Sequence, residues 1–171
     1  CLTSSAVYLL NDITDVEADR KHPEKKHRPI ASGKLPLNVA WSAAIVLVLI
    51  ALPAAYFLAP ALAAILALYF TINILYSRWL KHVPVLDVMI ISAGFVLRVA
   101  AGVSLITVER FSPWLYVITT LFSLYIGLGK RRAEMTLLSQ GAGSHRKVLD
   151  GYTIPLLDQY ITIVSGTTIV T

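Results

Sequence analysis

The chain has 171 residues, of which 56% are hydrophobic and 15% are charged, and its formal net charge is +5. A soluble domain is closer to half apolar and a quarter charged, so this composition indicates a protein with several membrane-spanning helices. The single cysteine, Cys1, excludes an internal disulfide. Because the chain opens and closes inside apolar runs and lacks an initiator Met, we expect one transmembrane domain over residues 1–171, truncated at both ends.

Apolar runs alternate with polar segments along the chain. Residues 2–10 are expected to end a spanning helix, and residues 11–19 are acidic. Four further spans are predicted by length and apolarity, at residues 35–59, 61–77, 83–107 and 113–129. Pro60 is predicted to mark a tight turn, and the other segments between spans are predicted to be loops, at residues 20–34, 78–82, 108–112 and 130–150. One more apolar segment starts at Tyr152 and is expected to be broken by Pro155 and Asp158.

Positive charge gathers on one side of this layout. Of the 15 Lys and Arg residues, 13 are in the loops 20–34, 78–82 and 130–150. The positive-inside rule therefore predicts that these three loops are cytoplasmic and that the chain is integral to the cell (inner) membrane. Because the acidic stretch is on the same side, the cations around it would line the entrance to the site and attract a phosphorylated substrate.

The acidic stretch reads Asn11-Asp12-Ile13-Thr14-Asp15-Val16-Glu17-Ala18-Asp19. On a helix, Asp12, Asp15 and Asp19 stand at i, i+3 and i+7 and share a stripe, whereas Glu17 points away. Carboxylates on one face repel each other, and a divalent cation such as Mg²⁺ removes that repulsion. The alternative is a solvated acidic helix end. Because acidic residues that end a membrane helix are usually functional, we favour a metal–phosphate site with Asp12, Asp15 and Asp19 as ligands, assisted by Asn11.

Two ionisable residues stand inside the third predicted span. Asp87 and Arg98 are eleven residues apart, about three turns, and therefore on one face of the helix. Ionisable residues within a membrane normally face the interior of the bundle. We expect Asp87, near the cytoplasmic end, to be catalytic. Arg98 has two open interpretations, substrate binding or pairing with a neighbouring helix.

A basic cluster follows the fourth predicted span and reads Gly129-Lys130-Arg131-Arg132-Ala133-Glu134. Arg forks and Lys point charges suit a phosphate bound without metal, although the cluster would equally serve as a positive-inside anchor. Because neighbouring helical residues differ by about 100°, Arg131 and Arg132 cannot face one cavity equally. We expect Arg131 to face it together with Lys130 and Glu134, and Glu134 to pair with Lys130.

Two motifs together resemble the UbiA superfamily of intramembrane prenyltransferases. The first is Asn11-Asp12-x-x-Asp15-x-x-x-Asp19, which is similar to the first Asp-rich motif of that family, and the second is Arg28-Pro29-Ile30-Ala31-Ser32-Gly33. The resemblance implies an all-α polytopic membrane bundle, of which this chain holds about six of about nine transmembrane helices. It also implies that Asp12 and Asp15 are catalytic and bind a diphosphate through Mg²⁺. Tyr76 and Lys81 resemble the Tyr-x-x-x-Lys loop of the family, with one extra residue between them.

The basic cluster stands where most members of the superfamily have a second Asp-rich motif. Gly-Lys-Arg-x-Ala-Glu at this place resembles the branch that transfers 5-phosphoribose from phosphoribosyl diphosphate to decaprenyl phosphate. This resemblance implies substrate or phosphate contacts by a larger set: Arg28, Lys25, Lys81, Arg98, Lys130, Arg131, Glu134 and Tyr76. Two alternatives stay open. One is a prenyltransferase that moves a prenyl group from a prenyl diphosphate to an aromatic or lipid acceptor, and the other is a membrane transporter or channel.

Overall fold

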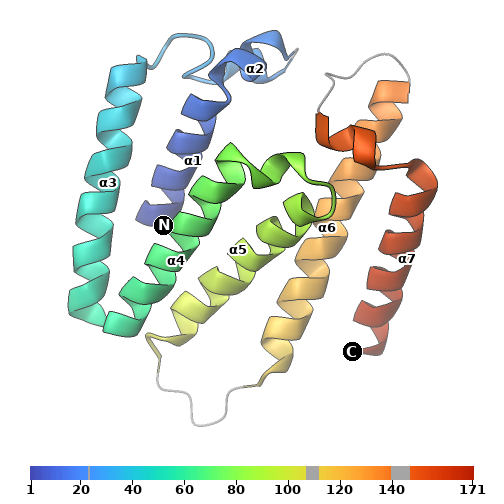
Figure 1. The fold of residues 1–171 in the computed structure, drawn as a ribbon. Helices are drawn as coiled ribbons and strands as arrows, with labels where there is room; N and C mark the ends of the chain where they lie inside the picture. Colours follow the sequence, from blue (N-terminus) through green and yellow to red (C-terminus); the bar gives the residue numbers. More distant parts are fainter. Residues whose placement is uncertain (23, 107–111, 140–146) are drawn as a thin grey trace. The chain divides into compact units, whose positions relative to one another are not determined.

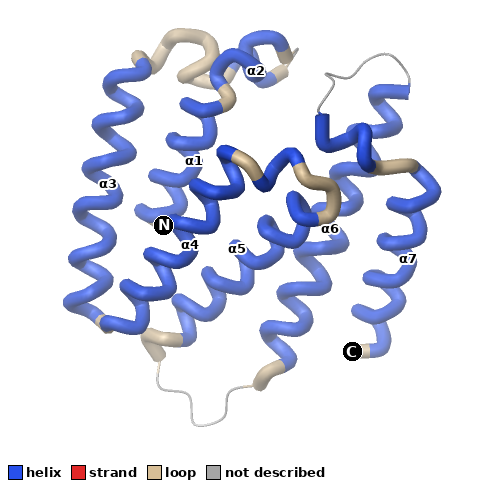
Figure 2. The backbone as a smooth tube through the Cα atoms, in the orientation of Figure 1, coloured by secondary structure: helices blue, strands red, loops and turns tan. Residues whose placement is uncertain are grey.

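The computed structural model describes residues 1–22, 24–106, 112–139 and 147–171, and in these ranges it contains helices and no strand (Figure 2). The predicted turn at Glu109 and Arg110 lies outside the described residues, as does Arg146. The chain forms two compact units, Cys1–Arg78 and Trp79–Thr171. The all-α expectation is confirmed.

The first unit is built from three long helices and a short one. Its elements are α1 (Leu2–Thr14), α2 (Val16–Lys21), the 3-10 turn η1 (Lys25–His27), α3 (Leu37–Leu58) and α4 (Pro60–Arg78). Within this unit α1 packs against both α3 and α4, and α3 packs against α4 (Figure 1). The three long helices therefore enclose a common space.

Small residues let α3 approach its neighbours closely. Ala40, Ala44 and Ala55 are each at most 3% exposed and recur on one face of the helix. Such small side chains at helix interfaces are typical of membrane bundles. On its other faces α3 exposes large apolar side chains, among them Phe57 and Leu58. This pattern suits a helix with one face on protein and the rest in lipid.

A tight turn joins α3 to α4. Ala59 is extended, with φ −162° and ψ 125°, and Pro60 is the first residue of α4, where its missing N–H needs no partner. The predicted turn at Pro60 is confirmed. Upstream, α3 continues as a helix through Pro53.

The second unit packs α6 between α5 and α7 (Figure 1). Its elements are the 3-10 turn η2 (Leu80–His82), α5 (Leu86–Val103), α6 (Trp114–Ser139), the 3-10 turn η3 (Lys147–Gly151) and α7 (Ile154–Val170). A buried cluster connects them: Val88, Leu128, Val148, Leu149, Tyr152 and Leu157. Helix α5 lies so close to α6 that a Cβ added at Gly127 would be 2.6 Å from Val88 Cγ1.

Two expectations about helix boundaries are wrong. Residues 130–139 are not loop, because α6 continues to Ser139 through a segment rich in good helix formers such as Lys, Arg, Ala, Glu and Leu. The basic cluster therefore lies within α6 and not at its end. Pro155 does not break the last helix either, since it stands in the first turn of α7, where proline is tolerated. Asp158 is inside that helix and pairs with Arg132.

Among the described residues, α3, α4 and α5 are long and apolar enough to cross a membrane, and α7 is apolar but shorter. The predicted span within α6 is not among these three. The three helices still identify the chain as an integral membrane protein.

Candidate functional site

The acidic stretch is split between two helices. Helix α1 ends at Thr14, Asp15 has φ −95° and ψ 5°, and α2 begins at Val16. The Thr14 hydroxyl donates to the carbonyl of Leu10 at 2.8 Å, a contact that often bends helices. The predicted unbroken helix is therefore wrong. Helical hydrogen bonds still cross the junction, from Asp15 N–H to Asn11 O at 2.9 Å and from Asp19 N–H to Asp15 O at 2.8 Å.

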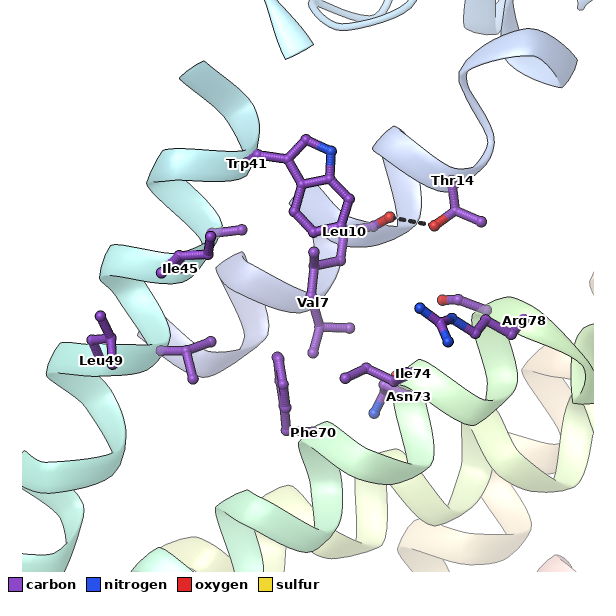
Figure 3. A pocket seen from close by; sticks show the side chains of 13 residues that line it. Val7, Leu10, Thr14, Trp41, Ile45, Leu49, Phe70, Asn73, Ile74 and Arg78 are labelled. Atoms are coloured by element: carbon purple, nitrogen blue, oxygen red, sulfur yellow. Dashed lines mark hydrogen bonds between the residues drawn. The ribbon is translucent and has the colours of Figure 1, made fainter. Parts of the chain in front are cut away.

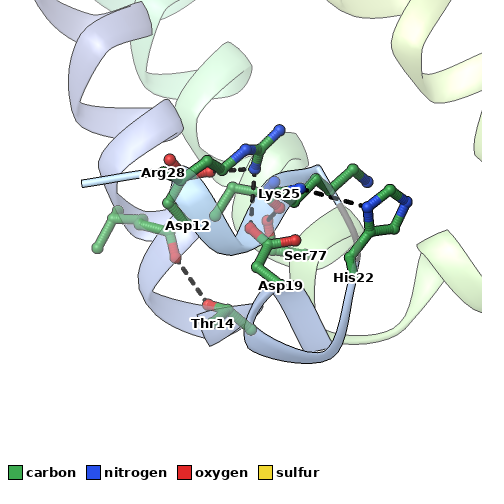
Figure 4. Close-up of polar contacts among 9 residues, drawn as sticks. Asp12, Thr14, Asp19, His22, Lys25, Arg28 and Ser77 are labelled. Atoms are coloured by element: carbon green, nitrogen blue, oxygen red, sulfur yellow. Dashed lines mark hydrogen bonds and ion pairs between the residues drawn. The ribbon is translucent and has the colours of Figure 1, made fainter. Parts of the chain in front are cut away.

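Arg28 joins two of the predicted metal ligands (Figure 4). Its Nη1 donates to Asp12 Oδ1 at 2.7 Å and to Asp19 Oδ2 at 2.9 Å. The loop that carries Arg28 is anchored by the next residues, since Ile30 is 3% exposed and the carbonyl of Ala31 accepts from Arg20 Nε at 3.2 Å. The two motifs that were predicted from the sequence therefore meet in one site.

The end of α4 is tied to the same stretch. The hydroxyl of Ser77, itself buried, donates to Asn11 Oδ1 at 3.0 Å. Asn11 thus turns its amide oxygen toward α4, while Arg28 holds Asp12 from the loop side. Glu17 points elsewhere and pairs with Arg20 at 2.9 Å on the surface. This separation of Glu17 from the other acidic residues agrees with the helical argument.

Burial and neighbouring charges shift the pKa of the Asp12 carboxyl, which follows the apolar run of α1. Burial raises the pKa of Asp12, the Arg28 guanidinium opposes that rise, and the nearby charges of Asp19 and Asp15 add to it. Lys25 also lowers this pKa, so three carboxylates share two nearby cations and the site keeps an excess of negative charge. A further cation would be favoured at this place.

The donor set fits Mg²⁺ that is held partly by substrate. Asp12, Asp15, Asp19 and Asn11 offer oxygen atoms, which Mg²⁺ prefers. Within the described ranges, no group of three or more His, Cys, Asp or Glu side chains lies close enough to hold a metal ion by itself. Arg28 takes the place between Asp12 and Asp19 where a cation would neutralise both. Because Mg²⁺ usually binds one or two protein carboxylates and completes its shell with water and phosphates, these residues suit a metal that arrives with a diphosphate.

Asp87 lies in a second polar network, at the start of α5. Its side chain is fully buried, and its Oδ2 accepts from Arg131 Nε at 2.6 Å. The hydroxyl of Tyr152 donates to Asp87 Oδ1 at 2.6 Å and accepts from the N–H of Val85, also at 2.6 Å. Burial and the bond to Asp87 raise the pKa of Tyr152. Both carboxylate oxygens of Asp87 are thus satisfied within the unit.

Arg131 is buried and Arg132 is exposed, which agrees with the expectation that the two cannot face one cavity equally. Arg131 is 6% exposed and also donates from Nη1 to Glu134 Oε2 at 2.7 Å. Arg132 pairs with Asp158 at 2.6 Å on the surface. The expected pairing of Glu134 with Lys130 is replaced by the pair with Arg131, three residues away instead of four. Lys130 itself is exposed.

The remaining predicted residues are spread over both units. Lys25 is half-buried in η1, and its N–H donates to His22 Nδ1 at 3.3 Å. Tyr76 is half-buried in α4 and Lys81 in η2. Arg98 places its guanidinium carbon 5.2 Å from the centre of the Phe95 ring. Sequence reasoning missed Tyr152, because nothing in the local pattern links it to an aspartate 65 residues earlier.

The helical fold of the chain is similar to that of a solved structure. The chain superimposes with a TM-score of 0.81 on the structure of a UbiA homolog from Archaeoglobus fulgidus bound to DMAPP and Mg²⁺, over 99% of this chain and 60% of that one. The two sequences are 17% identical, so the match establishes the helical fold alone.

Closer relatives are found by sequence. The chain is 38% identical over 169 residues to the decaprenyl-phosphate phosphoribosyltransferase of Mycobacterium tuberculosis, covering 99% of the chain and 55% of that protein. It is 38% identical over 170 residues to the enzyme of the same name from Mycolicibacterium smegmatis, of which it covers 53%. The chain therefore spans about half the length of these curated relatives. Residues 1–130 match the model of the UbiA prenyltransferase family, and the chain belongs to that family.

Proposed function

We propose that the protein to which this chain belongs transfers 5-phosphoribose from phosphoribosyl diphosphate to a polyprenyl phosphate, with decaprenyl phosphate as the acceptor. The observation that carries this proposal is the 38% identity, over 99% of the chain, to decaprenyl-phosphate phosphoribosyltransferases. The basic cluster stands where most members of the superfamily have a second Asp-rich motif, and it supports the proposed transfer. Its cations Lys130 and Arg131 suit an acceptor that is already an anion.

The donor diphosphate is assigned to the acidic end of α1 and α2. Asp12 and Asp15, with Asp19 and Asn11, would hold Mg²⁺, which supplies positive charge to offset the departing diphosphate. Arg28 is 39% exposed on its side chain and is shared by two carboxylates, so it can turn one donor toward a phosphate oxygen. Arg28 and the half-buried Lys25 are therefore assigned to the diphosphate.

The acceptor needs no general base. A monophosphate oxygen carries negative charge already, so it can attack the anomeric carbon of the ribose while the bond from that carbon to the diphosphate breaks. The protein then has to hold two anions in line and neutralise the charge that leaves. Lys130 is exposed on α6 and is assigned to substrate or phosphate contacts, as are Lys81 and Arg98 of the same unit and, separately, Tyr76 of the first unit.

Asp87 and Arg131 hold each other, and Glu134 is the second partner of Arg131. Arg131 can contact a phosphate if it gives up its ion pair with Glu134, which is more exposed than Asp87, and keeps its ion pair with Asp87. We assign Asp87 the task of fixing the direction of Arg131. The loops that carry these cations are assigned to the cytoplasmic side of the inner membrane, where the donor is available.

The test is a transfer assay on the full-length protein in native membranes or detergent micelles. Phosphoribosyl diphosphate labelled in the ribose is incubated with decaprenyl phosphate and Mg²⁺, and a lipid-extractable labelled product is expected. Farnesyl diphosphate with an aromatic acceptor serves as the competing substrate pair. If the protein ignores phosphoribosyl diphosphate and transfers the farnesyl group, the prenyltransferase alternative replaces this proposal. If neither transfer occurs while the protein conducts ions in vesicles, the transporter alternative does.

A further inference from the structure

A mainly apolar pocket of about 340 Å³ lies between α1, α3 and α4 (Figure 3). Its apolar walls include Val7 and Leu10 of α1, Ile45 of α3, and Phe70 and Ile74 of α4. The volume is at the lower end of the range typical of ligand pockets. All of the lining residues belong to the first compact unit, so its geometry is defined within that unit.

The pocket has a polar end. Thr14, Ser77 and Arg78 line it at the ends of α1 and α4, and Asn73 lines it about one turn earlier in α4. The Ser77 hydroxyl that lines the pocket is the same one that donates to Asn11, so the polar end adjoins the acidic stretch. A molecule seated in the pocket would thus have one end beside the candidate diphosphate site.

Arg78 supplies the charge at this end. It is exposed, and in Figure 3 its guanidinium reaches from α4 toward the pocket. It forms no ion pair with any residue that the structure describes, unlike Arg28, Arg131 and Arg132. Arg78 is also the single cation among the described residues that line the pocket. A cation at the end of an apolar pocket complements an anion that carries an apolar chain.

We propose that this pocket binds the first isoprene units of the lipid acceptor and that Arg78 binds the phosphate of that lipid. The inference rests on the proposed function and names a binding site for its acceptor. A free phosphate would gain nothing from the apolar walls, and a neutral lipid would gain nothing from Arg78. A polyprenyl monophosphate uses both, and it places its phosphate beside the donor site.

The test is the KM of the full-length enzyme for decaprenyl phosphate and, separately, for phosphoribosyl diphosphate. Arg78→Gln removes the charge, and we expect it to raise the KM for decaprenyl phosphate about tenfold or more while the KM for the donor stays unchanged. Lys34→Gln, which removes an exposed cation outside the pocket, is its control and should change neither constant.

A second pair of variants tests the apolar walls. Ile45→Trp fills the pocket from α3, and Ile50→Trp adds the same bulk to α3 outside it; both isoleucines are exposed, by 53% and 55%, so neither change strains the core. Ile45→Trp should raise the KM for decaprenyl phosphate and Ile50→Trp should not. If Arg78→Gln and Ile45→Trp leave that KM unchanged, or raise the donor KM equally, the pocket is not the acceptor site.

Photolabelling separates this inference from the proposed function. Farnesyl phosphate with a diazirine on its first isoprene unit should label residues of the pocket, and decaprenyl phosphate should compete. This labelling would support the pocket even in a protein that transfers a prenyl group instead of phosphoribose. Labelling confined to other helices in an enzyme that does transfer phosphoribose would overturn the pocket and leave the function standing.

Discussion

The Asp12 carboxylate near the end of α1 and the Asp87 carboxylate at the start of α5 are held in opposite ways, although Asp19, the second partner of Arg28, is 7% exposed on its side chain. Asp12 is 28% exposed on its side chain, and Arg28, its partner, is 39% exposed. Asp87 is fully buried and its partner Arg131 is 7% exposed. Both pairs use one arginine and have short contacts, of 2.7 and 2.6 Å. They differ in their access to water.

This difference predicts two roles. A partly solvated pair gains little from its own contact, so Asp12 can exchange Arg28 for a metal ion at small cost. A desolvated pair cannot exchange partners without leaving a charge uncompensated in a medium that stabilises it poorly. The first region is therefore suited to bind and release an anion with its metal, and the second to keep one fixed geometry. Each prediction below tests one side of this contrast.

The largest effect is expected from Asp87→Asn. The change leaves the buried Arg131 without its full counter-charge, and breaking a buried pair in this way lowers the free energy of unfolding by about 3–5 kcal/mol. Thermal unfolding of the purified protein in detergent measures it. The double variant Asp87→Leu with Arg131→Met should recover much of the loss, because it removes both charges. A single variant with wild-type stability would contradict the view of this pair as a fixed element.

The next effect is on catalysis. Asp12→Ala and Asp15→Ala should each lower kcat by about 10²–10³-fold or more, as expected when one group that neutralises developing charge is removed. Their thermal stability should stay close to wild type, because Asp12 is partly exposed. Glu17→Ala is the matched control, since Glu17 pairs with Arg20 on the surface. Equal losses in Glu17→Ala would show that position around the helix does not matter.

A smaller effect is expected from Tyr152→Phe. Without the hydroxyl, Asp87 Oδ1 loses its donor and the Val85 N–H loses its acceptor, which costs about 1–3 kcal/mol for groups that are buried. Tyr125→Phe removes an exposed hydroxyl on α6 and should be silent in the same thermal unfolding experiment. Equal melting temperatures for both variants would mean that Tyr152 does not hold Asp87.

An effect of similar size concerns the close contact between α5 and α6 at Gly127. Gly127→Ala pushes a methyl group to 2.6 Å from Val88 Cγ1, and the overpacking should cost about 1–3 kcal/mol. Gly129→Ala, two residues on, meets nothing within 4 Å and should be neutral or stabilising by up to about 1 kcal/mol from helix propensity. The two melting temperatures, compared directly, test the close approach. Identical shifts would contradict it.

Much of this arrangement is visible in the sequence because it is local. Apolar runs of sufficient length predict α3 and α4, and a proline between them predicts the turn at Pro60. The helical angle between Arg131 and Arg132 predicts that the two cannot share one environment, and the acidic motif predicts a charged end to α1. Each of these inferences needs only neighbouring residues and the geometry of one helix.

What the sequence did not predict depends on tertiary contacts. The change from α1 to α2 at Asp15, next to a Thr14 hydroxyl that donates to the carbonyl of Leu10, was not predicted from the acidic stretch. Tyr152 donates a hydrogen bond to Asp87, which is 65 residues earlier in the chain. Glu134 could pair with Lys130 or Arg131 by spacing alone, and burial of Arg131 next to Asp87 decides between them. Arg78 was assigned to a loop, so its place beside a pocket depended on how α1, α3 and α4 pack.

The most direct test of the account is donor binding at the end of α1. Melting temperature is measured with and without Mg²⁺ and phosphoribosyl diphosphate, because a ligand at 100 times its Kd stabilises the folded state by about 2.7 kcal/mol. We expect a clear rise for wild type and for Glu17→Gln, and no rise for Asp12→Asn. A full rise in Asp12→Asn would contradict the assignment of the diphosphate to this site.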